Sequence, residues 1–262
     1  MKALQAALWM EILKTRKSAV FKISVYFFIF IGIMMGLLMY LSMHPEIASR
    51  SSTMNMKSSF IGEFGWKAFY GLLLQLVLSV GVIGSGIVTS WTFGREFADR
   101  VIKDLLALPV SRSTIVISKL IVLLVWSILL MLITLIAAFI TGALIRLPGW
   151  AEADLFSFLK TYLICSVLIA FLITPVAFVA SVGRGYMLAI SVVILIMILT
   201  QLMFVGFPAL AVWFPWALPA IFSGVAGPAV PDASVVSYFL YLLVVLAGMF
   251  GTIGWWRFGD HK

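Results

Sequence analysis

Long stretches without any charged residue are the strongest constraint on how this chain can fold. Five such intervals contain 23 to 27 positions each, and they are residues 23–45, 68–94, 120–145, 161–183 and 233–256. A charge at the centre of a bilayer costs roughly 2.5–3.5 kcal/mol on insertion scales, and a helix of about 20 apolar residues crosses the hydrocarbon layer. Each interval therefore predicts one transmembrane helix.

A sixth charge-free interval, residues 185–231, has 47 positions and would be long enough for two helices. Its second half carries five prolines, which remove backbone donors and break helix interiors. We therefore predict one full span followed by a re-entrant or interfacial segment that is buried in protein. The whole chain, 1–262, is expected to be a single transmembrane domain with six spans, at about 20–41, 68–92, 119–145, 158–181, 187–207 and 235–256.

The composition supports this class. Hydrophobic residues make up 63% of the chain and charged residues only 11%, whereas soluble domains are about half apolar and about a quarter charged. This excludes a cytosolic enzyme, a disordered tail and a secreted module, and indicates an all-α integral membrane protein. The single cysteine, Cys165, cannot form an internal disulfide or a multi-thiolate metal site.

The distribution of lysine and arginine predicts the topology. With the N-terminus inside, 13 of the 18 basic residues fall on the inner side, and the five outer ones are Arg50, Lys57, Lys67, Arg146 and Lys160. Because basic residues accumulate in cytoplasmic loops, both termini are expected in the cytoplasm. The acidic residues divide evenly, so the whole net charge of +8 lies on the inner face and gives no reason to invoke nucleic acid.

Residues 2–17 place Leu4, Leu8 and Ile12 at helical spacing, with the charged side chains on other faces. This pattern predicts an amphipathic helix on the inner leaflet before the first span. An ordinary basic leader that only sets the topology is the alternative.

The cytoplasmic segment 93–119 is the most informative loop. Phe97, Val101, Leu105 and Leu108 recur at helical spacing, and opposite charges at i, i+4 pair Glu96 with Arg100, Asp99 with Lys103 and Arg100 with Asp104. Pro109 then ends the helix, and Ser111 or Ser113 can cap the next one. The segment is either a solvated connector or a docking element for a cytoplasmic partner.

Residues for catalysis or ion coupling are missing from the pattern. There is no phosphate-binding loop, no paired carboxylates within a span and no histidine at depth, so we expect no enzyme activity in this chain. Ion-driven carriers usually keep ionisable groups in the bilayer, and the predicted spans carry charged side chains only near an end, as with Lys22. The candidates for a translocation path are neutral polar side chains: Gln75, Ser79, Thr200 and Gln201.

Segment 94–119 resembles the loop between the second and third spans of bacterial ABC-2 type permeases, the transmembrane subunits of ABC exporters. Arg100 and Val101 stand where that family has a small residue and a threonine. The matching positions are Glu96, Ile102, Leu105, Leu106, Pro109, Val110, Ser111, Arg112 and Lys119.

The resemblance implies a membrane permease that works in the bacterial cell membrane as a homodimer or with a paralogue. Two cytoplasmic ABC ATPase subunits would bind the ATP and Mg²⁺ and drive export of a peptide, lipid or amphipathic drug. Helix 95–108 would be the coupling helix seated on the ATPase, and 208–231 would resemble the family's outer re-entrant hairpin. The coupling residues would be Glu96, Phe97, Asp99, Arg100, Lys103, Asp104, Leu105, Leu106, Pro109 and Arg112.

Two other functions remain as alternatives at this point. One is a membrane adaptor or immunity protein that recruits a cytoplasmic partner without transporting anything. The other is an ion-coupled carrier, which the absence of ionisable groups within the predicted spans disfavours.

Overall fold

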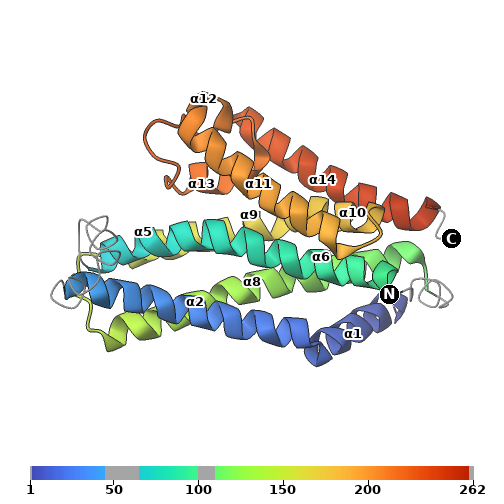
Figure 1. Cartoon of the computed structure of the whole chain (residues 1–262), viewed down its shortest axis with the longest axis horizontal. Coiled ribbons are helices and arrows are strands. Elements are labelled where there is room, and N and C mark those ends of the chain that lie inside the picture. Colours follow the sequence, from blue (N-terminus) through green and yellow to red (C-terminus); the bar gives the residue numbers. More distant parts are fainter. Residues whose placement is uncertain (1, 45–64, 100–109, 260–262) are drawn as a thin grey trace.

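The computed structural model describes residues 2–44, 65–99 and 110–259, and every regular element in these ranges is a helix (Figure 1). Six helical stretches are long and apolar enough to cross a membrane, as the charge-free intervals predict. They are Ala19–Met43 (α2), Trp66–Ala98 (α5, η1 and α6), Arg112–Leu144 (α8), Leu155–Val182 (α9 and α10), Tyr186–Gly206 (α11) and Val235–Phe258 (α14).

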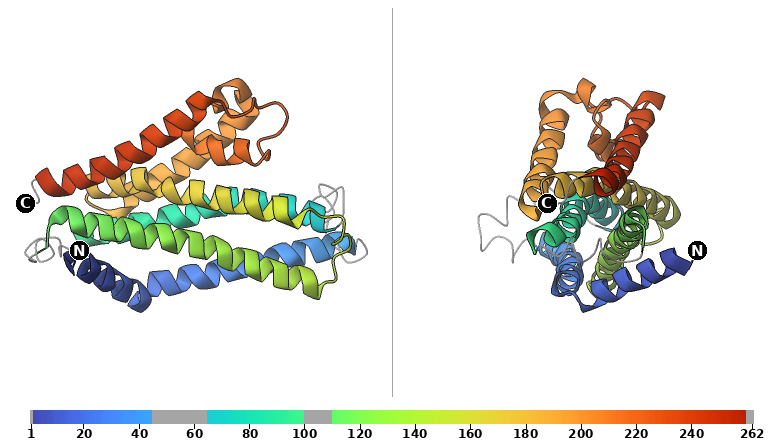
Figure 2. Two further views of the ribbon diagram at one scale, coloured as in Figure 1. Left: turned by 180° about the vertical axis from the view of Figure 1, so that it is seen from behind. Right: turned by 90° about the vertical axis from the view of Figure 1, so that its right-hand side faces the viewer.

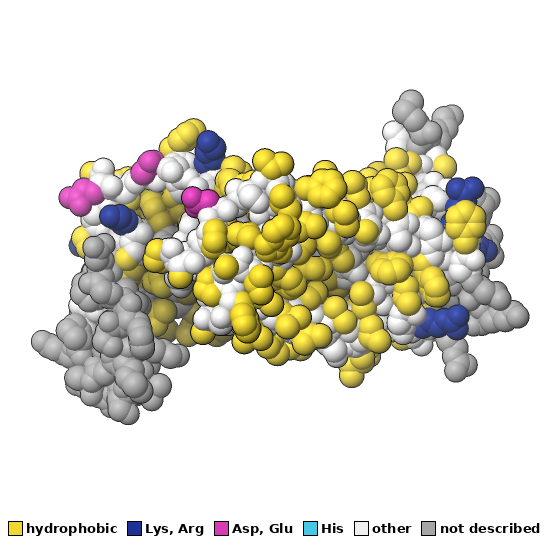
Figure 3. All heavy atoms as spheres, turned by 90° about the horizontal axis from the view of Figure 1, so that it is seen from above, with side chains coloured by type: hydrophobic (Ala, Val, Ile, Leu, Met, Phe, Trp, Pro, Cys, Tyr) yellow, Lys and Arg dark blue, Asp and Glu magenta, His cyan; other side chains and the backbone are white. Residues whose placement is uncertain are grey.

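The bundle has two distinct ends. Both termini and the chain on either side of residues 100–109 lie at one end, which we call the termini end. The connection between α8 and α9 and the short helices after α11 lie at the other, the far end (Figures 1 and 2). Figure 3 shows a broad apolar surface between charged side chains gathered at the two ends. A membrane would lie around this apolar band.

The N-terminal helix α1 (Lys2–Lys17) lies oblique to the bundle and packs against α8. Ala7, Glu11 and Thr15 form its buried side, while Trp9 and Ile12 are exposed. The predicted helix is confirmed. Its inward side includes a glutamate, which the Leu4, Leu8 and Ile12 pattern did not indicate.

Small residues bring pairs of helices together within the subunit. A Cβ on Gly32 would lie 2.8 Å from the Thr134 carbonyl oxygen, and one on Gly36 would meet the Thr141 side chain, so α2 and α8 approach closely. α10 and α14 meet in the same way at Gly248. Small residues therefore allow close contacts between helices inside one chain.

Two spans are interrupted by irregular turns. The fourth divides into α9 (Leu155–Phe171) and α10 (Ile173–Val182), because Pro175 cannot donate to the Phe171 carbonyl four residues earlier. The second contains a π-helical turn, η1 (Val77–Gly81), between α5 (Trp66–Leu76) and α6 (Val82–Ala98).

A serine caps the start of α8. Of the two predicted candidates, Ser111 and Ser113, it is Ser111 whose side chain accepts a hydrogen bond from the Thr114 amide.

The proline-rich segment folds into three short helices at the far end, between α11 and α14 (Figure 1). They are α12 (Pro208–Ala211), the 3-10 turn η2 (Pro215–Ala217) and α13 (Leu218–Phe222). Most of α13 is buried, and the Cys165 thiol of α9 donates to the Pro219 carbonyl at 3.4 Å. Protein contacts thus bury α13, while Leu210 of α12 and Trp213 are exposed.

Candidate functional site

A cavity of about 500 Å³ lies towards the far end of the bundle. Its walls are the α5–η1–α6 junction, α11, and the short helices η2 and α13. All four residues predicted for a translocation path line this one cavity: Gln75, Ser79, Thr200 and Gln201. These residues lie on two spans separated by more than 100 positions in the sequence, so the fold is what brings them together.

The π-helical turn shapes the wall formed by the second span. Its extra residue disturbs the regular ladder of backbone hydrogen bonds. Ser79 compensates, because its hydroxyl donates to the carbonyls of Gln75, at 2.9 Å, and Leu76, at 3.2 Å. Such turns are often found at functional sites. This one contributes Leu78 and Ser79 to the cavity lining and lies between two further lining residues, Gln75 and Val82.

The two glutamine amides are the most polar groups of the cavity. Gln75 and Gln201 are both exposed, and neither side chain has a hydrogen bond to another residue that the structure describes. An amide left unpaired in an apolar medium costs about 2–7 kcal/mol. A lipid-facing position would therefore be unfavourable for both, and this side of the bundle suits water, cargo or another protein.

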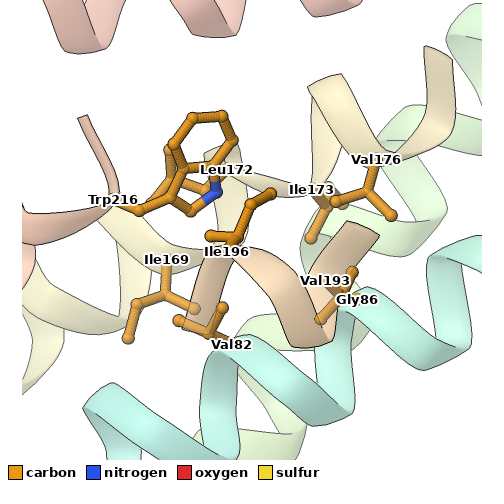
Figure 4. Close-up of a pocket in the computed structure, with 9 residues that line it drawn as sticks. All are labelled: Val82, Gly86, Ile169, Leu172, Ile173, Val176, Val193, Ile196 and Trp216. Carbon is orange, nitrogen blue, oxygen red and sulfur yellow. The ribbon is translucent and has the colours of Figure 1, made fainter. Parts of the chain in front are cut away.

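A smaller apolar pocket of about 10 Å³ adjoins the cavity, and Val82 and Trp216 line both. Figure 4 shows Trp216, Leu172 and Ile196 around this pocket, with Gly86 and Val193 further along it. Its lining is aliphatic apart from the Trp216 indole and Gly86. The polar cavity thus gives way to an apolar one deeper in the bundle, with the indole between them.

The structure describes four of the predicted coupling residues, and these four lie at the termini end. Residues 95–98 form the last turn of α6 and not the start of a separate helix, which corrects the predicted start of the coupling helix at 95. Phe97 packs edge-on to Trp256 of α14, and Arg112 donates to the carbonyls of Trp256 and Arg257, both at 3.4 Å. Outside the described residues lie Arg100, Lys103, Asp104, Leu105, Leu106 and Pro109.

Glu96 and Asp99 differ in their surroundings. Asp99 is exposed and accepts from Arg95 at 2.9 Å. Glu96 is buried and pairs with Lys119 of α8, whereas its predicted i, i+4 partner Arg100 lies outside the described residues. The Lys119 ammonium is almost completely buried, and a buried charge is unfavourable unless an opposite charge pairs with it. The Glu96 carboxylate provides that opposite charge.

Lys119 also contacts a second carboxylate, which the sequence pattern did not identify. Its Nζ lies 3.2 Å from Glu11 Oε2 of α1, and Lys14 pairs with Glu11 at 3.0 Å. Burial raises the pKa of Glu11, but the charges of Lys119 and Lys14 outweigh burial and hold the pKa below its ordinary value.

The prediction that the spans bury no ionisable group is therefore wrong at this end. One signal in the sequence could have revealed the cluster. Ala7, Glu11 and Thr15 follow one another at intervals of four residues, so they share one face of the helix, and that face carries a single acidic side chain.

These charges are not part of the cavity. Neither Glu11, Glu96 nor Lys119 lines it. Over the ranges that the structure covers, no group of three or more histidine, cysteine, aspartate or glutamate side chains is arranged to hold a metal ion. The site therefore has two separate parts, a neutral cavity towards the far end and an ionic cluster at the termini end.

The sequence pattern of the ABC-2 family transporter proteins matches residues 7–200, which is more than half of the chain. The chain belongs to the ABC-2 transporter family. A curated relative, the bacitracin transport permease protein BCRB of Bacillus licheniformis, is 32% identical over 186 residues, covering 70% of this chain and 87% of the relative. Both findings agree with the resemblance of segment 94–119.

Membership of the ABC-2 family, together with six apolar helices, makes the chain a membrane permease subunit of an ABC exporter. It is a multi-pass protein of the bacterial cell membrane. In this family the permease spans the membrane and a separate partner subunit carries the ATPase. The cavity and the ionic cluster are therefore features of a protein that moves cargo with energy supplied from outside the chain.

Proposed function

We propose that this permease exports an amphipathic peptide, and that the cavity lined by Gln75 and Gln201 forms part of its path. The observation that carries the proposal is the pair of exposed, unpaired amides beside apolar and aromatic side chains in one cavity. Neutral amides and hydroxyls can bind peptide groups, while Phe204 and Trp216 provide apolar contact. The bacitracin permease relative supports a peptide cargo.

The proposed assembly has two permeases, either two copies of this chain or this chain with a paralogue, and two ATPase subunits that bind ATP and Mg²⁺. A second permease beside α5 and α11 would cover the amides from lipid and complete a path between the subunits. This arrangement would remove the cost of exposing Gln75 and Gln201 to hydrocarbon. Both termini and residues 100–109 would face the cytoplasm, where the ATPase binds.

The cargo site can be tested with Gln75→Leu and Gln201→Leu in cells that express the permease with its ATPase, using bacitracin as the probe. Each variant should lower the tolerated bacitracin concentration at least several-fold, because an amide that contacts peptide groups is lost. Ser191→Leu is the matched control, since Ser191 is an exposed polar residue of α11 outside the cavity lining. Unchanged tolerance in the double glutamine variant, at equal expression, would contradict the proposal.

The ATPase contact can be tested with Leu105→Glu. If residues 100–109 bind the ATPase, a charge at an apolar contact position should abolish co-purification of the ATPase while the permease still inserts in the membrane. Undiminished ATPase yield with this variant would show that the motor binds elsewhere. An ATPase that is stimulated without any transported compound would favour the adaptor function.

A further inference from the structure

A buried ionic cluster at the termini end joins three helices that are not consecutive in the chain. Lys119 of α8 is 1% exposed, and its Nζ contacts Glu11 of α1 and Glu96 of α6. Lys14 of α1 lies 3.0 Å from Glu11 and 3.5 Å from Glu96. Two carboxylates and two ammonium groups thus form a neutral cluster with Lys119 at its centre.

The positions of these residues along the chain connect the cluster to coupling. α6 ends at Ala98 and leads into residues 100–109, and α8 begins at Arg112 directly after them. Glu96 lies in the last turn of α6, and Lys119 is the eighth residue of α8. The cluster therefore ties together the two helices that flank the proposed ATPase contact, and it adds α1 to them through Glu11.

The burial pattern of α1 shows how much this helix depends on the cluster. Its three buried residues are Ala7, Glu11 and Thr15, one small apolar residue and two polar ones, and the larger apolar side chains Leu4, Leu8 and Met10 are only half-buried. The Thr15 hydroxyl is already bonded to the Glu11 carbonyl of its own helix. Glu11 is therefore the one side chain of these three that bonds across to α8, through Lys119.

The cluster is also incompletely satisfied and has alternative pairings. Glu96 Oε2 is buried without a hydrogen-bond partner among the residues that the structure describes. Lys14 is close enough to both carboxylates to pair with either one. Buried charges often contribute little net stability compared with apolar side chains, and their best-attested use is to specify one arrangement among several. A network with two available pairings fits an element that shifts between two states.

We propose that Lys119 is a positioning residue for energy coupling, because it fixes α1 to the ends of α6 and α8 so that all three move together when the ATPase acts on residues 100–109. The proposal rests on the proposed function, in which that segment contacts the ATPase. Through α1, whose outer side carries Trp9 and Ile12, the movement reaches the membrane surface beside the bundle.

The test is hydrogen–deuterium exchange of the purified permease–ATPase complex, without nucleotide and with ATP plus vanadate. In the unmodified complex, the amides of residues 2–17 should change their exchange between the two conditions, together with those at the ends of α6 and α8. In Lys119→Met, residues 2–17 should exchange at least tenfold faster without nucleotide and no longer respond to vanadate trapping. Lys119→Arg, which keeps the charge, should restore the response.

Two further variants make the result decisive. Lys22→Met is the matched control, because Lys22 is an exposed lysine at the same end, outside the cluster, and it should behave as the unmodified complex. If Lys119→Met does not fold, Glu11→Gln removes one charge with little change in volume and should give the same loss of response. A nucleotide response of α1 that survives in Lys119→Met or Glu11→Gln would overturn the proposal.

The failure of the underlying function has a different signature. If Leu105→Glu leaves the ATPase bound, then the proposed ATPase contact is wrong, whatever α1 does. The faster exchange of residues 2–17 in Lys119→Met without nucleotide does not depend on the position of the ATPase. Exchange that is unchanged in this variant would show that the cluster does not hold α1.

Discussion

The contact between α10 and α14 gives a prediction whose size follows from the structure. A Cβ on Gly248 would lie 2.4 Å from the Pro175 nitrogen and 2.6 Å from the Thr174 carbonyl carbon, both backbone atoms at the break between α9 and α10. Ordinary contacts of a Cβ begin at 3.4 Å. Gly248→Ala must therefore push the helices apart by about 1 Å, because backbone atoms cannot rotate away.

The cost can be estimated from two contributions. Overpacking of this kind costs about 1–3 kcal/mol. The displacement also weakens the hydrogen bond from Thr174 Oγ1 to the Val245 carbonyl, which is 2.9 Å long and contributes about 1 kcal/mol. The free energy of unfolding should fall by about 2–4 kcal/mol, which corresponds to a lower melting temperature by about 4–16 °C for a chain of this size.

The chain contains a suitable reporter for the assay. Cys165 is the single cysteine in the sequence and is fully buried, so a thiol-reactive dye should label it only when the protein unfolds. Melting curves of the purified permease in detergent would compare Gly248→Ala with Gly254→Ala. The second variant is the control, because a Cβ on Gly254 of the same helix would meet nothing within 4 Å. Equal midpoints for Gly248→Ala and the unmodified protein would refute the packing argument.

Three further predictions address other parts of the molecule. Single cysteines introduced in a Cys165→Ala background should be labelled from outside intact cells at Ser52 and Ser223 but not at Ala98; labelling of Lys262 from outside would require an odd number of spans. Gly94→Ala should separate α6 from the turn before α11, since its Cβ would meet the Tyr186 backbone, and should lower the melting temperature by several degrees. At neutral pH, Glu11→Gln should speed proteolysis within α1. Because the pKa of Glu11 is lowered in the folded protein, its stabilising contribution is present above the ordinary carboxyl pKa and is lost as pH falls through the lowered value, so the two proteins should converge in acid.

Sequence patterns predicted the spans well because the cost of a charge in hydrocarbon acts on each residue separately. All six predicted spans are present as helices, and the largest errors are at the termini end. There α6 extends to Ala98 and α8 starts at Arg112, beyond the predicted 68–92 and 119–145. Charged residues set the limits of the predicted spans there, yet each helix continues past them, because Glu96 and Lys119 neutralise each other.

The candidate path residues were predictable by type and not by position in space. Neutral polar side chains inside apolar helices are few enough to notice, yet many of them only bond to their own helix, as Thr200 does to Ile196. The sequence could not show which of them meet, because a cavity depends on how separate helices cross. The π-helical turn beside Ser79 and the short helices after α11 create that space.

By itself, then, the sequence determined the number of membrane crossings, the end at which basic residues gather and the family to which the permease belongs. These depend on local composition and on a contiguous motif. Only the tertiary structure decided that Gln75 and Gln201 face one cavity and that Glu11, 108 positions before Lys119, neutralises it. Pairing of buried charges and amides is a property of distances between helices, and residues so far apart in the chain leave no periodic signal of it.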